Sequence, residues 1–448
     1  MFSRFANTFR TTSKRRLYTS MLAGTVPIVL VSNLSASSEG TQGGQSNGGK
    51  PSHHKPGGGF VNPWESFDQM DITPVVAYKM YKDWESNPIP PPERLPPLTI
   101  PSFTPPTSLS PTELSEWSKD IKCTFLGHAC FLVEFPKKDE EERGLRVLFD
   151  PVWSHRCSPS QLIGPARVAP PPIKLEEIPH VDAVIISHNH YDHLDIATLK
   201  HLYKAQPPGS IHFFAPLGNK SWFTSNTGCT PEQVSELDWW ESRKLELSSS
   251  NNSNSEPGKG KNGEGVLGKM GRGGGRGGSL KVMATPCQHF TGRGVFDRND
   301  TLWASWSVES EGGGKVWFAG DTGYKSIPRG VPIEEEDKYP YCPAFKEIGE
   351  REGPFDLGMI PIGAYDPRWF MSRVHCSPED SVELHRETKS RKSLGMHHSC
   401  WQLTCEPMDE PPKRLRKACE KYGISEEEFG VSGLGETRRF KVEKRGGE

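Results

Sequence analysis

Short apolar runs alternate with polar segments along the middle and carboxyl-terminal parts of the chain. Several of these runs are four to eight residues long, are rich in β-branched and aromatic side chains, and end in Asp, His or Gly. Buried strands that lead into functional loops have this pattern. The runs are CTFLGHACFLVEF, LRVLFD, VDAVIIS, SIHFFAP, LKVMAT, LWASWSVE, KVWFAGD and LGMIPIG. They predict an α/β protein with a substantial amount of sheet.

Two segments carry helix signals. SPEDSVELHRETKSR begins with Ser377 as N-cap, has Pro378 at the first helical position and has Asp380 three residues after the cap. PPKRLRKACEKYG has proline at its start and Gly423 at its end. The chain shows no internal repeat with a period of about 20 to 50 residues, so a repeat architecture is not expected.

Residues 1–38 differ from the rest of the chain in composition. They contain many Ser and Thr, no acidic residue, and basic residues such as Arg4, Arg10 and Arg16. This composition is typical of mitochondrial transit peptides. The apolar run at 21–31 is shorter than a transmembrane helix and contains proline, although with its flanks it would serve as a single membrane anchor or as a secretory signal. We predict a mitochondrial, membrane-associated protein, with another membrane compartment as the alternative.

Two further segments are low in complexity. Residues 39–59 are dominated by Gly, Ser, Pro, Lys and His and are predicted to be a disordered linker, in which His53 and His54 are not expected to be ligands. Residues 246–279 are polar and rich in glycine, which predicts a surface insertion in the main body of the chain. That main body, residues 60–445, is predicted to form one folded domain.

Charge and cysteine content narrow the class of protein. The 54 basic and 56 acidic side chains give a net charge of −2, so no overall field attracts a polyanion, and no nucleic-acid partner is predicted. The 10 cysteines are scattered singly, without a CxxC pair, which fits neither a disulfide framework nor a thiolate zinc site. We interpret them as mostly buried thiols in a reducing compartment.

The stretch IISHNHYDHLD, at residues 185–195, carries the densest ligand chemistry in the chain. His188, His190 and His193 cannot share one helix face, because neighbours on a helix face are three and four residues apart. These residues therefore lie on a loop at the end of the DAVIIS strand. Imidazole and carboxylate groups suit zinc, iron or manganese, and the loop also offers Asp192.

The number of ligands in this loop suggests more than one metal. A catalytic metal needs about three protein ligands and the loop offers four, which favours two ions completed by residues from other strand ends. Three later strand-like runs end in an isolated His or Asp and supply His289, Asp321, and either His397 or His398.

This order of ligands resembles the binuclear hydrolases of the metallo-β-lactamase fold. More specific motifs resemble the family of N-acylphosphatidylethanolamine-hydrolysing phospholipases D. They are FVNPW, FLGHACFLVEF, FDPVWSHRCSPSQLIGPAR, ELDWWE, PCQHF and PIGAYDPRWFM. The resemblance covers roughly residues 60–440 except the glycine-rich insertion. It implies an αββα sandwich, in which two mixed sheets are flanked by helices.

The resemblance also implies which residues hold two Zn²⁺ ions. The first ion would be held by His188, His190 and His289. The second would be held by Asp192, His193 and His397, with Asp321 bridging the two. The sequence departs from the family directly afterwards, where HSCWQL replaces a Trp-Gly-Thr-Phe type of run.

The activity implied by the resemblance is a phospholipase D reaction. A metal-bridging hydroxide would cleave N-acylphosphatidylethanolamine to phosphatidic acid and an N-acylethanolamine. Asp192 and Asp321 would be part of the catalytic machinery, and His375 would be a proton donor or a phosphate contact. His128 and Asp150 are expected to support the ligands from behind.

A lipid substrate requires access from a membrane surface. Arg368 beside Trp369 suits the rim of a lipid headgroup site, and Tyr191 is a further expected substrate contact. The expected partners are therefore a phospholipid and a membrane surface, and the resemblance implies a tendency to form homodimers.

Two alternatives keep part of this interpretation. The same fold and metals would also serve hydrolysis of another phosphodiester or ester, such as a nucleic acid. A metal-binding protein without catalytic activity is the second alternative.

Overall fold

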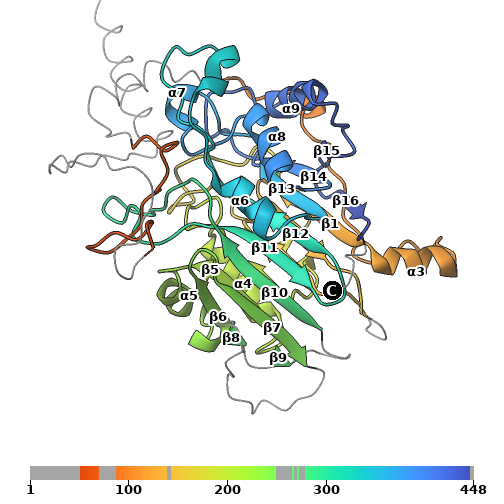
Figure 1. Ribbon diagram of the computed structural model, residues 1–448. Helices are drawn as coiled ribbons and strands as arrows, with labels where there is room; N and C mark the ends of the chain where they lie inside the picture. Colours follow the sequence, from red (N-terminus) through yellow and green to blue (C-terminus); the bar gives the residue numbers. More distant parts are fainter. Residues whose placement is uncertain are drawn as a thin grey trace, which may run out of the picture.

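The computed structural model describes residues 51–69, 87–138, 143–248, 265–266, 270–271 and 278–443. Two mixed β-sheets pack against each other, and helices cover both outer faces (Figure 1). The predicted αββα sandwich is confirmed.

The first sheet has seven strands in the order β16-β1-β2-β3-β4-β5-β6. Strands β3 to β6 run parallel to one another, whereas β16, β1, β2 and β3 pair in antiparallel fashion. The strands are β1 (Ile121–Gly127), β2 (Cys130–Glu134), β3 (Arg146–Phe149), β4 (Ala183–Ile185), β5 (His212–Pro216), β6 (Val234–Leu237) and β16 (Thr437–Phe440).

The second sheet has nine strands, of which eight follow the order β15-β14-β13-β12-β11-β10-β7-β8 and β9 pairs with β7. Strands β12 to β15 are parallel, and β7, β10, β11 and β12 pair in antiparallel fashion. The strands are β7 (Ser242–Ser248), β8 (Gly265–Val266), β9 (Met270–Gly271), β10 (Ser279–Thr285), β11 (Ser305–Ser310), β12 (Lys315–Phe318), β13 (Leu357–Pro361), β14 (Ser393–Met396) and β15 (Phe429–Gly430).

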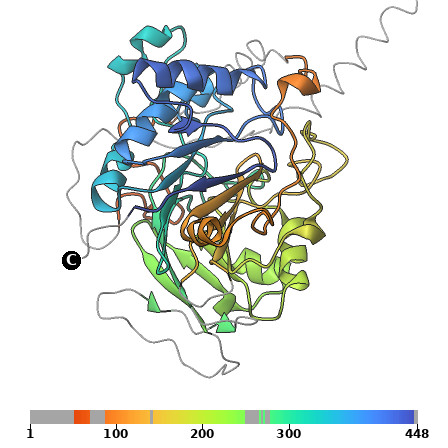
Figure 2. The ribbon, with the colours of Figure 1, turned by 90° about the vertical axis from the view of Figure 1, so that its right-hand side faces the viewer.

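The helices lie in two groups on opposite sides of the sheets (Figure 2). Helices α4 (Ile196–Ala205) and α5 (Lys220–Thr227) cover the first sheet, while α6 (Ala344–Arg351), α8 (Pro378–Glu387) and α9 (Glu410–Lys421) cover the second. The other helices among the described residues are α3 (Pro111–Lys119), α7 (Arg368–Met371), η1 (Pro92–Arg94), η2 (Leu175–Glu177), η3 (Pro231–Gln233) and η4 (Ile333–Lys338). None of the helices within the described residues is long and apolar enough to cross a membrane.

Alternating side chains of the first sheet pack into two separate apolar cores. Phe131 and Val133 belong to the core that includes the second sheet, whereas Leu132 between them packs on the side of α4 and α5. Successive side chains of a strand point to opposite faces, so a sheet covered on both faces is apolar at nearly every position. This explains the continuous apolar runs of the sequence. Trp303 and Trp306 are fully buried in the larger core.

The predicted helices are confirmed with small shifts at their ends. The Ser377 side chain accepts a hydrogen bond from the Asp380 N–H, and the Asp380 side chain accepts from the Ser377 N–H, which completes a capping box on α8. Helix α9 begins at Glu410, and Gly423 follows its end with a φ of 67°.

Residues 51–59, which the sequence predicts as part of a disordered linker, adopt a defined structure. Residues 51–67 lie against the main body: the Phe60 N–H donates to the Asn299 carbonyl, and His53 is buried. A glycine-rich sequence does not prevent order here, because Gly59 adopts a φ of 75° in a turn that brings apolar Phe60 into the core. The predictions for residues 1–50 fall outside the described residues, as does most of 249–277.

Candidate metal centre

The 187–195 loop connects β4 to α4, as the sequence predicts. Strand β4 ends at Ile185, and α4 begins at Ile196. Asp195 is the N-cap of α4, since its side chain accepts a hydrogen bond from the Ala197 N–H. The loop is therefore fixed at one end by a buried strand and at the other by a capped helix.

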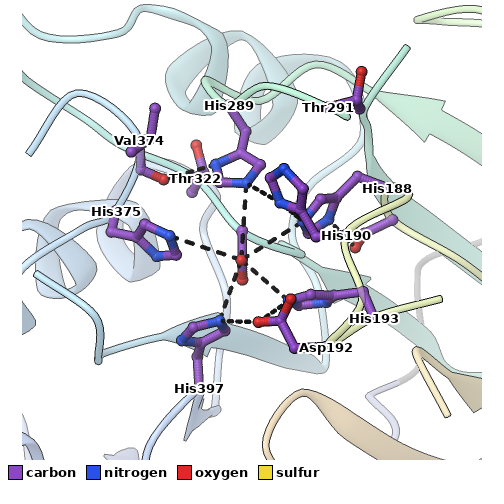
Figure 3. A network of polar contacts seen from close by, with 12 residues as sticks. His188, His190, Asp192, His193, His289, Thr291, Thr322, Val374, His375 and His397 are labelled. Atoms are coloured by element: carbon purple, nitrogen blue, oxygen red, sulfur yellow. Dashed lines mark hydrogen bonds and ion pairs between the residues drawn. The ribbon is translucent and has the colours of Figure 1, made fainter. Parts of the chain in front are cut away.

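Histidines from two loops form the first ligand set. His188 Nε2 lies 2.8 Å from His190 Nδ1, and His289 Nε2 lies 3.3 Å from the same His190 nitrogen. His289 belongs to the segment after β10, which places it opposite the 187–195 loop (Figure 3). These three nitrogen atoms can hold one metal ion.

The second ligand set contains one carboxylate. Asp192 Oδ2 lies 3.5 Å from His193 Nε2 and 3.5 Å from His397 Nε2. His128 Nε2 approaches the same carboxylate oxygen at 3.0 Å. His397 directly follows β14, so this set also joins residues from separate strand ends.

Asp321 lies between the two sets. Its Oδ2 atom is 3.7 Å from His188 Nε2 and 3.8 Å from His289 Nε2 on one side. On the other side it is 3.1 Å from His193 Nε2 and 3.2 Å from His397 Nε2. One carboxylate that faces two groups of histidines is the arrangement of a ligand shared by two metal ions.

Several buried ligand atoms have no hydrogen-bond partner within the described part of the chain, which also fits metal ions at this site. His193 Nε2, His397 Nε2 and Asp321 Oδ1 are buried and have no hydrogen-bond partner among the described residues. Buried polar atoms normally have a partner. The nitrogen and oxygen donors suit zinc, iron or manganese, so the residues fit the two ions that the sequence predicts.

Other residues orient the ligands from behind. Asp150 Oδ2 lies 2.6 Å from His193 Nδ1 and also accepts a hydrogen bond from the Ser187 hydroxyl at 2.5 Å. The Ser187 hydroxyl is 2.9 Å from His188 Nδ1, and the Val374 carbonyl is 2.9 Å from His289 Nδ1. Such contacts fix the tautomer and direction of a ligating imidazole. Asp150 lies beside His193, as expected for a supporting residue, and its supporting role stays a prediction.

The charges of the two histidine sets differ. Burial lowers the pKa of His289 to about 3 and that of His190 to about 4, so both are neutral at neutral pH. Burial also disfavours charge on His397, but the Asp321 and Asp192 carboxylates outweigh it and raise that pKa to about 9. The second set thus holds protons that a metal ion would displace.

Strained backbone supports several of these side chains. His128, Asp150 and His397 adopt φ values of 57°, 37° and 62°, in the left-handed region that non-glycine residues rarely enter. Strain of this kind gathers at functional sites, where the surrounding structure holds it in place. The His397 N–H donates to the His128 carbonyl, so two of the strained residues support each other.

The geometry selects His397 over His398. His398 points away from the carboxylates: its ring stacks on Phe125 at 5.8 Å, and its Nδ1 lies 2.8 Å from the Ser399 hydroxyl. The residue pattern alone left this choice open, since both histidines follow β14, whereas the family resemblance implied His397.

His375 lies beside the centre, as expected. Its Nε2 is 3.9 Å from Asp321 Oδ2, and its ring lies 5.2 Å from that of His289 and 5.0 Å from that of His397. Burial lowers its pKa to about 3, so the imidazole is neutral at neutral pH. As a neutral imidazole, it can donate a hydrogen bond to a substrate or accept one from it.

The expected headgroup role of Arg368 is not supported. Its guanidinium pairs with Glu336 at 2.6 Å and with Asp380 at 2.9 Å, and these two carboxylates neutralise it. Sequence order alone placed it beside Trp369, but the first residue of α7 turns toward η4 and α8 instead. Trp369 is half-buried, and its role as a substrate contact stays a prediction.

Tyr191 lies at the edge of the centre. Its hydroxyl donates to the Arg293 carbonyl at 3.1 Å, and the Arg293 guanidinium covers its ring at 3.8 Å. Arg293 also donates to the Asn189 and Leu194 carbonyls at 2.8 Å, which fastens the 187–195 loop. Sequence reasoning missed Arg293, and no motif marks it. It also missed Ser187, although that residue directly precedes the first ligand.

Comparisons with known proteins agree with this centre. Residues 145–398 match the family model described as a beta-lactamase superfamily domain. The chain is 34% identical over 318 residues to N-acyl-phosphatidylethanolamine-hydrolyzing phospholipase D 1 of Caenorhabditis elegans, a match that covers 70% of this chain and 74% of that protein. It is 30% identical over 319 residues to the mitochondrial N-acyl-phosphatidylethanolamine-hydrolyzing phospholipase D of Saccharomyces cerevisiae, covering 71% of this chain and 55% of that protein.

Among solved structures, the chain is similar to Igni18, a metallo hydrolase of Ignicoccus hospitalis. The TM-score is 0.42 and the identity 18%, and the match covers 72% of this chain and 100% of Igni18.

The fold and the grouped His and Asp side chains define a metallo-hydrolase of the metallo-β-lactamase superfamily. Within that superfamily, the chain belongs to the family of N-acyl-phosphatidylethanolamine-hydrolyzing phospholipases D.

Proposed function

We propose that this protein is a zinc-dependent phospholipase D that hydrolyses N-acylphosphatidylethanolamine to phosphatidic acid and an N-acylethanolamine. The observation that carries the proposal is the position of Asp321, whose Oδ2 atom faces His188 and His289 on one side and His193 and His397 on the other. Family membership supports the choice of substrate, since relatives from two organisms bear this activity in their names.

Two zinc ions held by the seven residues would polarise the phosphodiester and lower the pKa of a bound water. The protein's part is to hold the ligands in place. Asp150 and Ser187 orient His193 and His188, and the Val374 carbonyl orients His289. Because these contacts are buried, the ligand geometry is set before substrate arrives.

His375 is proposed as a contact to the phosphate or to the leaving ethanolamine oxygen. Its Nδ1 is buried without a partner among the described residues, and its Nε2 points at the Asp321 carboxylate. A neutral imidazole in this position can donate one hydrogen bond to a phosphate oxygen. Trp369 and Tyr191 are proposed as substrate contacts at the edge of the centre.

The proposal extends to the membrane. Leu162 and Phe296 have exposed fractions of 87% and 92%, and each lies on a loop. The loop with Phe296 adjoins the 187–195 loop through Arg293. Exposed apolar side chains on surface loops suit contact with a bilayer.

A mitochondrial, membrane-associated location and a homodimer belong to the same proposal. The composition of residues 1–38 supports the location, as does the word mitochondrial in the name of the yeast relative. No nucleic-acid partner is proposed.

The test combines metal analysis with lipid hydrolysis. The wild-type protein is expected to contain about two zinc ions in the centre and to release N-acylethanolamine, whereas Asp321→Asn is expected to lose metal from the centre and to lose turnover. Asp337→Asn is the matched control, because this carboxylate has an exposed fraction of 74% and pairs with Lys325. Metal binding without lipid hydrolysis, together with cleavage of an RNA or another ester, would discard the substrate and keep the fold.

A further inference from the structure

A second group of ligand-type side chains lies outside the candidate metal centre. His53 Nε2 is 2.6 Å from Asp238 Oδ1, and His54 Nε2 is 2.7 Å from Asp238 Oδ2. Together the three residues offer two imidazole nitrogens and a carboxylate within one small volume. None of them contributes to the two ligand sets around Asp321.

Local backbone structure brings the two adjacent histidines together. Neighbouring side chains point to opposite faces in an extended strand, so a straight segment would separate His53 from His54. Here the chain folds back: the Lys55 N–H donates to the Gly59 carbonyl at 3.0 Å, and the Val61 N–H donates to the His53 carbonyl at 2.9 Å. The two rings consequently meet edge to face, with centroids 4.6 Å apart.

The third member comes from the first sheet. Asp238 directly follows β6, and Oδ1 of its side chain accepts a hydrogen bond from the Trp239 N–H at 2.8 Å. His53 stacks on the Trp239 ring at 4.1 Å, and Trp64 stacks on Trp239 at 5.3 Å. The orientation of both His53 and Asp238 is thus fixed by contacts other than their own pairing.

The chemistry of the group matches that of a metal site. Two imidazoles and one carboxylate are a common donor set for zinc, and a fourth position can be taken by water. The side chain of His53 is 7% exposed, whereas His54 and Asp238 are 20% and 15% exposed, so solvent can reach one side. The ligand atoms are gathered as closely as in the first catalytic set, where His188 Nε2 and His190 Nδ1 are 2.8 Å apart.

The residues that follow His53 and His54 in the chain connect this group to the segment that carries His289. The Asn62 side-chain amide donates to the His289 carbonyl at 2.8 Å, and the Ser66 hydroxyl donates to Gln288 Oε1 at 2.6 Å. Anchoring residues 53 and 54 therefore also holds the segment that supports a catalytic ligand.

We propose that His53, His54 and Asp238 form a separate site for a zinc-type divalent ion, which fastens residues 51–67 to the end of β6. The ion is structural: it replaces the protons shared between the imidazoles and the carboxylate, and it takes no part in the reaction. The site is independent of the phospholipase activity.

The test is the metal content of the untagged full-length protein, measured by mass spectrometry after equilibration with zinc and gel filtration. The double variant His53→Gln/His54→Gln is expected to carry one metal ion fewer per chain than the wild type. Glutamine can still donate a hydrogen bond to Asp238 but is a poor zinc ligand, so the fold is retained. Asp238→Asn gives the same loss by removing the carboxylate.

Two further variants separate this site from other metal. His155→Gln removes an exposed histidine and is expected to leave the metal content unchanged. This variant is the control for adventitious metal binding at the surface. Asp321→Asn is expected to lose catalytic metal and to keep the ion at His53, so the two losses add in a combined variant. Equal metal content in the wild type and in the double glutamine variant would overturn the proposal and leave a group joined by hydrogen bonds alone.

A second measurement reports on the anchoring itself. Chelator treatment of the wild type is expected to speed hydrogen exchange at the Val61 amide, which is bonded to the His53 carbonyl. In the double glutamine variant, exchange is expected to be fast already and unaffected by chelator. A chelator effect of the same size in both proteins would contradict a metal at this position.

Discussion

At the scale of single residues, Asp150 shows how much of the candidate centre depends on side chains that contact the proposed ligands from behind. It is fully buried, its backbone is strained, and it joins His193 to Ser187. Because it accepts a hydrogen bond at His193 Nδ1, it leaves the Nε2 lone pair free to face the centre.

Replacing Asp150 by Asn is expected to weaken the second metal position. The amide nitrogen can face His193 Nδ1, which would then have to accept a hydrogen bond and leave the proton on Nε2, where it blocks metal binding. Metal content should fall toward one ion in the centre, and kcat/KM should fall by about 10- to 100-fold. Metal analysis and lipid hydrolysis check this. Unchanged metal content beside an unchanged Asp337→Asn control would show that Asp150 does not select the tautomer.

Glu387 gives a stability effect that depends on pH. Burial raises its pKa to about 7, and one of its oxygens is buried without a partner among the described residues, while the Tyr324 hydroxyl donates to the other at 2.8 Å. A carboxyl pKa above its unfolded value means that the folded state binds the proton more tightly. The group therefore costs stability as pH rises from about 4.5 through 7.

Replacing Glu387 by Gln is expected to remove that cost. The variant should be about 1 kcal/mol more stable than the wild type at pH 8 and equally stable near pH 4.5, because an amide carries no charge to bury. Urea unfolding at both pH values measures the difference. If the free energy of unfolding rises equally at both pH values, the cause is packing and not the buried charge.

At the scale of elements, α8 connects the site to the second sheet. Its N-terminus follows His375 by three residues, and Val382 and Leu384 bury its inner face in the larger core. The cap at Ser377 satisfies backbone donors that would otherwise be buried without partners.

Replacing Ser377 by Ala is expected to lower the free energy of unfolding by about 1 kcal/mol. Ser110→Ala is the matched control, because Ser110 forms the same capping box on α3, a helix without buried residues. Fraying of α3 exposes little apolar surface, so its loss should be smaller. Thermal or urea unfolding of both variants checks the difference, and equal losses would show that burial of the helix does not matter.

At the scale of the whole molecule, residues from separate strand ends meet at one edge of the sandwich. In the second sheet, β12 and β14 both run parallel to β13 and lead into the loops with Asp321 and His397, while β4 of the first sheet leads into the loop with His188. Parallel strands deliver their carboxyl ends to the same edge, which is why ligands more than 200 residues apart can surround one carboxylate.

The membrane surface proposed for this edge gives a prediction at the same scale. Phe296→Ser combined with Leu162→Ser is expected to reduce binding to phospholipid vesicles and to raise KM for lipid presented in vesicles, while kcat and metal content stay unchanged. Ile100→Ser is the control, since Ile100 is 79% exposed on a different segment. Vesicle sedimentation measures binding. Equal binding by all three proteins would exclude these loops as the membrane contact.

The sequence by itself determined the elements and most of the candidate ligands. Apolar runs marked the strands because a sheet covered on both faces must be apolar, and the spacing of His188, His190 and His193 excluded a helix. The ligand chemistry of a short loop is local, so it can be seen without a fold.

Only the tertiary structure decided which distant residues meet. It turned Arg368 toward Glu336 and Asp380, and it placed His53 and His54 beside Asp238. These outcomes depend on where backbone turns point neighbouring side chains and on pairings across 185 residues. Composition and spacing carry neither kind of information, because both arise from packing between elements.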